Sequence, residues 1–170
     1  YRRQRQMCIR DRVEETGYKG KFFIEPGRYV VAECGVLLGT VHATKFNGEN
    51  RYVGTDLGFN VLVRPAMYDS FHDIEIFRDG GEPDTDLVEQ SIVGNICESG
   101  DILAKKRMLP LIKEGDIVAA LDAGAYGFVM SSSYNQRPRA AEVLITSDGT
   151  PKLIRRRETL DDLTRCFVEE

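Results

Sequence analysis

Residues 40–55, TVHATKFNGENRYVGT, contain two candidate strands, Thr40–Phe46 and Arg51–Thr55, and set the pattern for most of the chain. Similar apolar and β-branched runs follow, and pairs of turn residues such as Gly80-Gly81 separate several of them. The further strands that we predict are Asp73–Phe77, Leu87–Gly94, Ile117–Leu121, Phe128–Tyr134, Ala141–Thr146 and Pro151–Arg156. Many short strands joined by turns favour a mainly β fold, either a closed or nearly closed barrel or a sandwich.

Three segments have other patterns. Phe22-Phe23-Ile24 is a short apolar run that predicts a strand ending at Pro26-Gly27. Apolar residues from Tyr29 to Leu38 have helical spacing, and Gly39 is expected to end that helix. Asp101–Leu109 is expected to form a short helical or irregular connection before a proline.

The C-terminal residues Glu158–Phe167 predict a modest helix, with Leu160 and Leu163 facing inward. No internal repeat and no low-complexity tract interrupts the chain.

Residues 1–12, YRRQRQMCIRDR, differ from the rest of the chain. They contain five arginines and almost no core-forming residues, so we expect no packed structure there. We interpret them as a translated sequencing adapter fused to a truncated reading frame; a natural basic arm is the alternative. The start at Tyr1, without methionine, also suggests a fragment.

Composition narrows the class of protein. The chain has 170 residues, 42% hydrophobic and 29% charged, which suits one soluble globular domain. A net charge of −4 gives no electrostatic case for nucleic acid, and no apolar run approaches the ~20 residues that span a membrane. Four cysteines without a CxxC pair and only two histidines predict no metal site, and indicate reduced thiols in a cytoplasmic protein.

Three short motifs combine a chemically able side chain with glycine, which lets the backbone approach a ligand closely. They are Glu25-Pro26-Gly27-Arg28, Cys97-Glu98-Ser99-Gly100-Asp101 and Asp122-Ala123-Gly124-Ala125-Tyr126-Gly127. In this order, between Lys21 and Arg157, they resemble the C-terminal part of the diaminopimelate decarboxylases, which are pyridoxal-phosphate enzymes of lysine biosynthesis.

The resemblance implies a domain plan. Residues 13–38 would be the last strand, active-site loop and helix of a (β/α)8 barrel, and residues 39–170 the β-barrel domain that follows it. A complete (β/α)8 barrel takes about 250 residues and cannot fit in this chain. The fragment would therefore lack the Schiff-base lysine and be inactive alone. The complete enzyme would convert meso-diaminopimelate to L-lysine and carbon dioxide, as a homodimer with shared active sites.

The same resemblance implies the cofactor contacts. Glu25 would keep the pyridine nitrogen of pyridoxal phosphate protonated, which deepens the electron sink. Pro26, Gly27 and Arg28 would lie against its phosphate, where backbone N–H groups and a guanidinium are both suitable. Tyr126 would touch both cofactor and substrate. The simpler alternative is a turn at Pro26-Gly27 with charged neighbours.

Substrate binding is expected at Arg64-Pro65-Ala66-Met67-Tyr68, where Arg64 and Tyr68 would hold the distal part of the substrate. Arg28 could also reach a substrate carboxylate, and Glu98 the distal ammonium. The alternative for this stretch is a surface arginine and a half-buried tyrosine.

Cys97 is the predicted catalytic residue. Decarboxylation leaves a carbanion that must be protonated, and a thiol with an ordinary pKa of about 8.5 is mostly protonated at pH 7. Most lone cysteines are small buried hydrophobes, but the flanking Glu98, Ser99 and Asp101 argue against burial here. Cys34, on an apolar helical face, fits the buried type. His42 and His72 are expected to be ordinary surface or hydrogen-bonded residues.

Two other functions stay open from the sequence. Decarboxylases of ornithine, arginine or carboxynorspermidine share the two-domain plan, although Glu98-Ser99 and the spacing of Arg64 and Tyr68 favour a substrate with a distal amino-acid head. In another class, the chain would be a non-catalytic β-domain that dimerises or binds a partner. That alternative gains weight because none of four lysines matches a Schiff-base lysine; these are Lys45, Lys105, Lys106 and Lys113.

Overall fold

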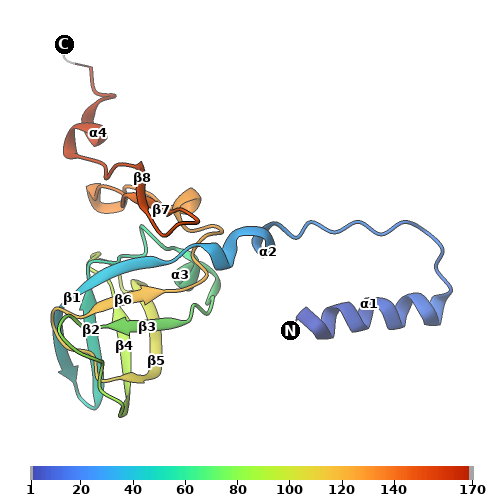
Figure 1. Cartoon of the computed structure of the whole chain (residues 1–170), viewed down its shortest axis with the longest axis horizontal. Coiled ribbons are helices and arrows are strands. Elements are labelled where there is room, and N and C mark those ends of the chain that lie inside the picture. The colour runs from blue at the N-terminus through green and yellow to red at the C-terminus, as the bar shows by residue number, and fades with distance from the viewer. Residues whose placement is uncertain (1, 169–170) are drawn as a thin grey trace.

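The computed structural model describes residues 2–168, and a twisted sheet of six strands dominates it (Figure 1). The strand order is β3-β6-β1-β2-β4-β5, and a separate pair, β7-β8, follows. The strands are β1 (Leu37–Asn47), β2 (Asn50–Thr55), β3 (Ile74–Phe77), β4 (Leu87–Val93), β5 (Ile102–Pro110), β6 (Ile117–Ala120), β7 (Glu142–Ile145) and β8 (Pro151–Arg155). The sheet is nearly closed, which confirms the predicted mainly β fold.

The remaining elements are helical, and all except α1 have three or five residues. They are α1 (Arg2–Thr16), α2 (Gly27–Val31), η1 (Ala32–Cys34), α3 (Arg64–Tyr68), η2 (Phe128–Met130), η3 (Tyr134–Gln136) and α4 (Leu160–Thr164). An extended segment separates α1 from the sheet, at the blue end of the chain in Figure 1.

Pairing and alternation explain the sheet. Asn47 pairs with Asn50 across the β1-β2 hairpin, while β2 runs parallel to β4 and every other neighbouring pair is antiparallel. In β2 every second residue is buried, as period-2 geometry requires. Buried Val41, Val53 and Ile92 help to form one hydrophobic core with the inner faces of the other strands.

Buried charges in this sheet are paired. Arg78 donates to the Asp116 carboxylate through Nε and Nη2, at 2.8 Å each, and to Asp84 at 3.1 Å. Buried Arg51 donates to Gln90 Oε1 at 2.5 Å and to the Ile112 carbonyl at 2.7 Å. A buried charge is costly unless it is hydrogen-bonded, so these contacts allow Arg51 and Arg78 to lie against the core.

The N-terminal expectations need correction. Residues 22–24 form no strand: their side chains are exposed, and no described strand lies beside them to share backbone hydrogen bonds. The predicted helix over Tyr29–Leu38 is reduced to α2 and η1, because residues 37–40 pair with β6 instead. Gly39 therefore lies inside β1, where a Cβ would collide with the side chain of Leu57. Cys34 is exposed, against the expectation of burial.

Two middle predictions are also wrong. Residues 101–109 contain a strand, β5, because residues 102–110 pair with β4; the run of basic side chains hides that strand in the sequence. Residues 128–134 form no strand but two short 3-10 turns, closed locally by the bond from the Met130 N–H to the Gly127 carbonyl.

The two ends of the chain show partial agreement. The C-terminal helix exists, but α4 is shorter than predicted; Leu163 is half-buried, and Leu160 is 68% exposed rather than facing inward. At the other end, residues 8–12 are all exposed, yet they belong to a helix. Ion pairs one turn apart, such as Arg12 with Glu15 at 3.3 Å, suit an exposed helix.

Candidate functional site

Backbone-to-backbone packing brings two of the motifs together. The N–H of Gly124 donates to the Ala32 carbonyl at 3.0 Å, and the N–H of Ala123 donates to the Gly35 carbonyl at 2.8 Å. A Cβ at Gly124 would collide with the Val31 carbonyl oxygen, and a Cβ at Gly35 with the backbone of Gly124. Glycine is therefore needed at both positions, and it docks the loop after β6 on the segment that includes α2 and η1.

This docking places Tyr126 over Gly27. A Cβ at Gly27 would lie 3.0 Å from the Tyr126 hydroxyl oxygen, tighter than an ordinary contact. Tyr126 itself has φ +59°, a left-handed conformation that is costly for a bulky residue and is found where surrounding structure enforces it. The first and third motifs thus share one site.

Arg64 completes this cluster from α3. Pro65 at the start of the helix and left-handed Asp69 at its end confine α3 to five residues. The Arg64 guanidinium carbon lies 5.8 Å from the ring centres of both Tyr68 and Tyr126, and Nη2 lies 3.1 Å from the Ser70 hydroxyl. The structure therefore gathers five of the predicted site residues, which are Gly27, Arg28, Arg64, Tyr68 and Tyr126.

The cluster is positively charged and incompletely hydrogen-bonded. Burial, followed by the nearby Arg28 cation, lowers the pKa of Arg64. The Nε atoms of Arg28 and Arg64 are both buried and have no hydrogen-bond partner among residues 2–168. Two cations with unused donors are suited to bind an anion such as a carboxylate or phosphate.

Glu25 and Pro26 contribute a turn. The Glu25 carbonyl accepts from the Gly27 N–H, and the Pro26 carbonyl from the Tyr29 N–H, each at 2.9 Å. The Glu25 side chain is exposed. The turn that we expected as the simpler alternative is therefore present. It positions Gly27 and Arg28 in the cluster.

The Cys97 loop forms a separate surface. Cys97 and Glu98 are exposed, and no described contact joins either of them to Arg64 or Tyr126. The Glu98 carboxylate stays within its own loop, 3.3 Å from the Ser99 hydroxyl. Exposure of the thiol agrees with the expectation that Cys97 lies outside the core.

Asp101 anchors that loop, and its role was missed. It is buried, against the expectation drawn from its charge, and its carboxylate accepts from the N–H groups of Phe59 at 2.6 Å and Ile96 at 2.8 Å. Burial raises the pKa of Asp101, and these two bonds oppose that effect. A Cβ at Gly94 would collide with the Asp101 carboxylate, so the glycine at position 94 is the feature of the sequence that is consistent with a buried Asp101.

His72 is the second residue that sequence reasoning underrated. It is 2% exposed, and its Nδ1 lies 2.8 Å from the Leu121 carbonyl oxygen, as a hydrogen-bonded histidine was expected to lie. Its Nε2 is buried and has no hydrogen-bond partner in the described part of the chain. Burial is the main cause that lowers the pKa of His72.

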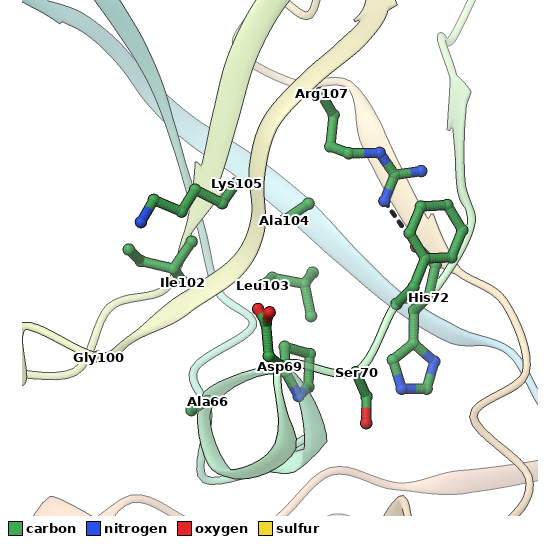
Figure 2. A pocket seen from close by; sticks show the side chains of 12 residues that line it. Ala66, Asp69, Ser70, His72, Gly100, Ile102, Leu103, Ala104, Lys105 and Arg107 are labelled. Carbon is green, nitrogen blue, oxygen red and sulfur yellow. Dashed lines mark hydrogen bonds between the residues drawn. The ribbon is translucent and has the colours of Figure 1, made fainter.

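His72 also borders a cavity of about 350 Å³ between α3 and β5 (Figure 2). Asp69 and Ala66 line it on the α3 side, and Leu103 and Lys105 line it on the β5 side. Gly100, which follows Cys97 in its loop, also lines this cavity, so the Cys97 loop borders the cavity.

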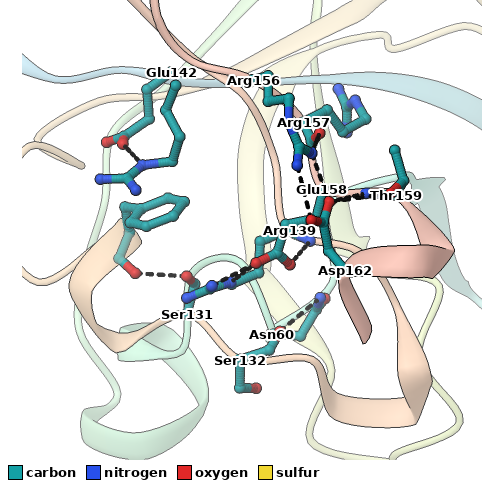
Figure 3. Close-up of polar contacts among 12 residues, drawn as sticks. Asn60, Ser131, Ser132, Arg139, Glu142, Arg156, Arg157, Glu158, Thr159 and Asp162 are labelled. Carbon is teal, nitrogen blue, oxygen red and sulfur yellow. Dashed lines mark hydrogen bonds and ion pairs between the residues drawn. The ribbon is translucent and has the colours of Figure 1, made fainter. Parts of the chain in front are cut away.

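Polar contacts hold the segment that follows the third motif (Figure 3). The Ser132 N–H donates to the Asn60 carbonyl at 2.8 Å, and the Arg139 guanidinium pairs with Glu158. These contacts attach residues 131–139 to the loop between β2 and α3 and to the segment between β8 and α4.

Within residues 2–168, no group of three metal-ligating side chains is close enough to hold a metal ion. None of the described helices is long and apolar enough to cross a membrane.

Residues 28–124 match the family described as the pyridoxal-dependent decarboxylase C-terminal sheet domain, and the chain belongs to that family. Among curated relatives, the diaminopimelate decarboxylase of Methanothermobacter thermautotrophicus is 45% identical over 92% of this chain and 36% of its own length. A crystal structure of a diaminopimelate decarboxylase is 41% identical with a TM-score of 0.79, covering 90% of this chain and 38% of that one.

The M. jannaschii diaminopimelate decarboxylase, solved in complex with L-lysine, is 39% identical with a TM-score of 0.77 and covers 84% of this chain and 32% of that one. The chain thus spans about a third of the length of the relatives that it matches.

Proposed function

We propose that this chain supplies one part of the active site of a pyridoxal-phosphate-dependent decarboxylase, which converts meso-diaminopimelate to L-lysine and carbon dioxide. The convergence of Arg28, Arg64 and Tyr126, with two buried guanidinium Nε atoms left without partners, is the observation that carries the proposal. The names of the relatives, and the L-lysine bound to one of them, favour this substrate class.

The cluster fits the cofactor. Buried, unpartnered Nε donors on Arg28 and Arg64 are costly unless an acceptor reaches them, and the cofactor phosphate and substrate carboxylates are such acceptors. Gly27 keeps open the space below the Tyr126 hydroxyl, which a side chain would fill. Pyridoxal phosphate, when bound, withdraws electrons from the substrate α-carbon as carbon dioxide leaves. Glu25 is the carboxylate that we assign to its ring nitrogen.

Substrate orientation falls to the arginines and tyrosines. Arg64 binds the distal carboxylate with the guanidinium edge that faces away from Ser70, and Tyr68 covers the same carboxylate. Arg28 contributes to the anion-binding surface, and Tyr126 lies between Gly27 and Arg64, so it contacts both ligands.

The Cys97 loop supplies the proton and contacts the partner subunit. The exposed Cys97 thiol holds the proton that the α-carbon takes up, and Glu98 binds the distal ammonium. Asp101 anchors this loop, while within residues 2–168 no hydrogen bond or ion pair joins Cys97 or Glu98 to the chain's own Arg64 or Tyr126. We therefore propose a homodimer, in which Cys97 and Glu98 complete the site of the partner subunit.

A chimera tests the proposed reaction. Residues 20–170 replace the matching C-terminal portion of the M. thermautotrophicus enzyme, which shares 45% identity. The chimera is expected to release carbon dioxide from meso-diaminopimelate and not from ornithine, and Arg64→Ala is expected to weaken substrate binding strongly. A folded, cofactor-loaded chimera that prefers ornithine, or that releases no carbon dioxide, contradicts the proposal.

Subunit mixing tests the shared site. A Cys97→Ala chimera and a chimera lacking the Schiff-base lysine are each inactive, but mixed dimers carry one intact site. Random exchange gives about half mixed dimers in a symmetric assembly, so activity is expected to return. Confirmed exchange without any activity would contradict the shared site.

A further inference from the structure

Ser70 is held beside Arg64 by the backbone. Asp69 ends α3 in a left-handed conformation, with φ +50°, which aspartate tolerates better than most residues. The N–H groups of Asp69 and of Ser70, the latter at 3.4 Å, both donate to the Arg64 carbonyl. The side chains of Ser70 and Arg64 therefore start from backbone positions that one shared carbonyl acceptor holds together.

The Ser70 hydroxyl accepts a hydrogen bond from the Arg64 guanidinium. Nη2 donates to Oγ at 3.1 Å, and within residues 2–168 no carboxylate forms an ion pair with Arg64. Because a hydroxyl is neutral, this contact orients the guanidinium without neutralising its charge. In the core, by contrast, the Arg78 guanidinium is neutralised by the Asp116 carboxylate at 2.8 Å.

The other neighbours of Arg64 do not fix its guanidinium. Arg28 is, after burial, the next cause that lowers the pKa of Arg64, so the two cations repel each other. The ring centres of Tyr68 and Tyr126 both lie 5.8 Å from the guanidinium carbon, and a ring attracts a cation without setting the direction of its N–H groups. A long side chain that a ligand must first order binds that ligand less tightly.

We propose that Ser70 is a positioning residue for Arg64: its hydroxyl fixes the guanidinium through Nη2 and leaves the opposite edge free to receive an anionic group of the ligand. That this group is the distal carboxylate of meso-diaminopimelate rests on the proposed function, whereas the restraint on Arg64 does not. Since Ser70 acts through Arg64, loss of its hydroxyl should weaken ground-state binding and leave the chemical step unchanged.

Three variants isolate this contact. Ser70→Ala removes the hydroxyl but keeps the backbone bonds to the Arg64 carbonyl. Ser70→Thr is the conservative variant, because it retains a hydroxyl on the same carbon. Ser91→Ala is the matched control, because the buried Ser91 hydroxyl accepts from the Lys106 N–H at 3.0 Å, between β4 and β5. An effect of Ser70→Ala that Ser91→Ala lacks therefore reports the contact with Arg64.

The first measurement uses the 170-residue chain and needs neither cofactor nor substrate. NMR of the arginine side chains reports the rate of rotation about the Nε–Cζ bond of Arg64, whose signal is identified by its loss in Arg64→Lys. We expect rotation to be about fivefold faster in Ser70→Ala, close to wild type in Ser70→Thr and unchanged in Ser91→Ala, because one hydrogen bond is lost. Equal rates in wild type and Ser70→Ala overturn the proposal.

The second measurement is a double-mutant cycle in the chimeric decarboxylase. Ser70→Ala is expected to raise KM for meso-diaminopimelate about fivefold with little change in kcat, and Ser70→Thr to restore KM. In the Arg64→Met background, Ser70→Ala is expected to leave KM unchanged, because no guanidinium is left to position. An equal rise in KM in both backgrounds would assign Ser70 a structural role and overturn the proposal.

Failure of this proposal and failure of the proposed function give different results. A folded, cofactor-loaded chimera that is inactive on meso-diaminopimelate overturns the proposed function. The rotation rates measured on the chain still decide whether Ser70 restrains Arg64, because they depend on neither the cofactor nor the substrate.

Discussion

Two pairs of arginines in this chain have opposite surroundings. Arg51 and Arg78 lie against the sheet core, and their donors are directed at side-chain and backbone acceptors within 3.1 Å. Arg28 and Arg64 lie in the candidate site beside Tyr126, and we call these two the rim arginines. Each has a buried Nε without a hydrogen-bond partner among the described residues. Since an unsatisfied buried donor destabilises the folded chain, the rim arginines are retained for a ligand and the core arginines for the fold.

The largest expected effect breaks the core side of this comparison. Asp116→Ala removes the carboxylate that accepts from Arg78 Nε and Nη2 and from the Lys113 N–H, and leaves a largely buried guanidinium without its main partner. Breaking a fully buried pair costs about 3–5 kcal/mol; because the Arg78 side chain is still 18% exposed, we expect the free energy of unfolding in urea to fall by no more than about 3 kcal/mol.

Asp84→Ala is the matched control, because Asp84 contacts the same arginine from a more exposed position. Its effect on unfolding is expected to be much smaller, since Arg78 keeps Asp116. If both variants lost the same free energy of unfolding, the contact of Arg78 with buried Asp116 would be no more important for stability than its contact with the more exposed Asp84.

The next effect sharpens the rim side. Arg64→Met should leave the free energy of unfolding within about 0.5 kcal/mol of wild type, because no carboxylate partner is left behind. In the chimeric enzyme the same change should weaken meso-diaminopimelate binding by about 100-fold, since a charged hydrogen-bonded pair is lost. Urea unfolding and steady-state kinetics measure the two quantities.

Arg51→Met is the converse control. It should destabilise the fold, because Gln90 and the Ile112 carbonyl lose their donor, and should leave substrate affinity in the folded enzyme unchanged. If Arg64→Met lowered the free energy of unfolding as much as Arg51→Met, the proposed distinction between the two pairs of arginines would be wrong.

The sequence predicts these two regions unequally. Alternating strands such as β2 were predictable because one face is buried at every second residue, and the predicted mainly β fold is confirmed. β5 was not, because residues 102–110 carry three consecutive basic side chains and become a strand only by pairing with β4. Local patterns fail where tertiary pairing decides the conformation.

The site shows the same division. Motifs with glycine pointed to Gly27, Arg28 and Tyr126, which the structure brings together. Asp101 and His72 were not singled out, because a buried aspartate and a buried histidine look like surface residues until their backbone partners are known. Residues that bind backbone groups carry no periodic signal in the sequence.

A smaller effect tests whether backbone packing builds the rim. Gly124→Ala places a Cβ against the Val31 carbonyl oxygen, so the loop after β6 must move away from the end of α2, at a cost of about 1–3 kcal/mol. Gly100→Ala is the control, since nothing lies within 4 Å of its Cβ position. Thermal unfolding compares the two; equal stability would mean that the loop does not need this contact.

The smallest expected effect is a dependence of the free energy of unfolding on pH that arises from His72. Burial, with Arg64 and Arg28, lowers the pKa of His72, so the unfolded chain, with its ordinary value near 6.5, binds more protons than the folded chain just below that pH. Stability should therefore be complete above about pH 6.5 and fall as the pH drops through the folded pKa. His72→Asn should flatten that part of the curve of unfolding free energy against pH, whereas His42→Asn, at an exposed position, should preserve it. A slope that survives in His72→Asn would assign it to another group and leave the His72 ring without an energetic link to the two arginines.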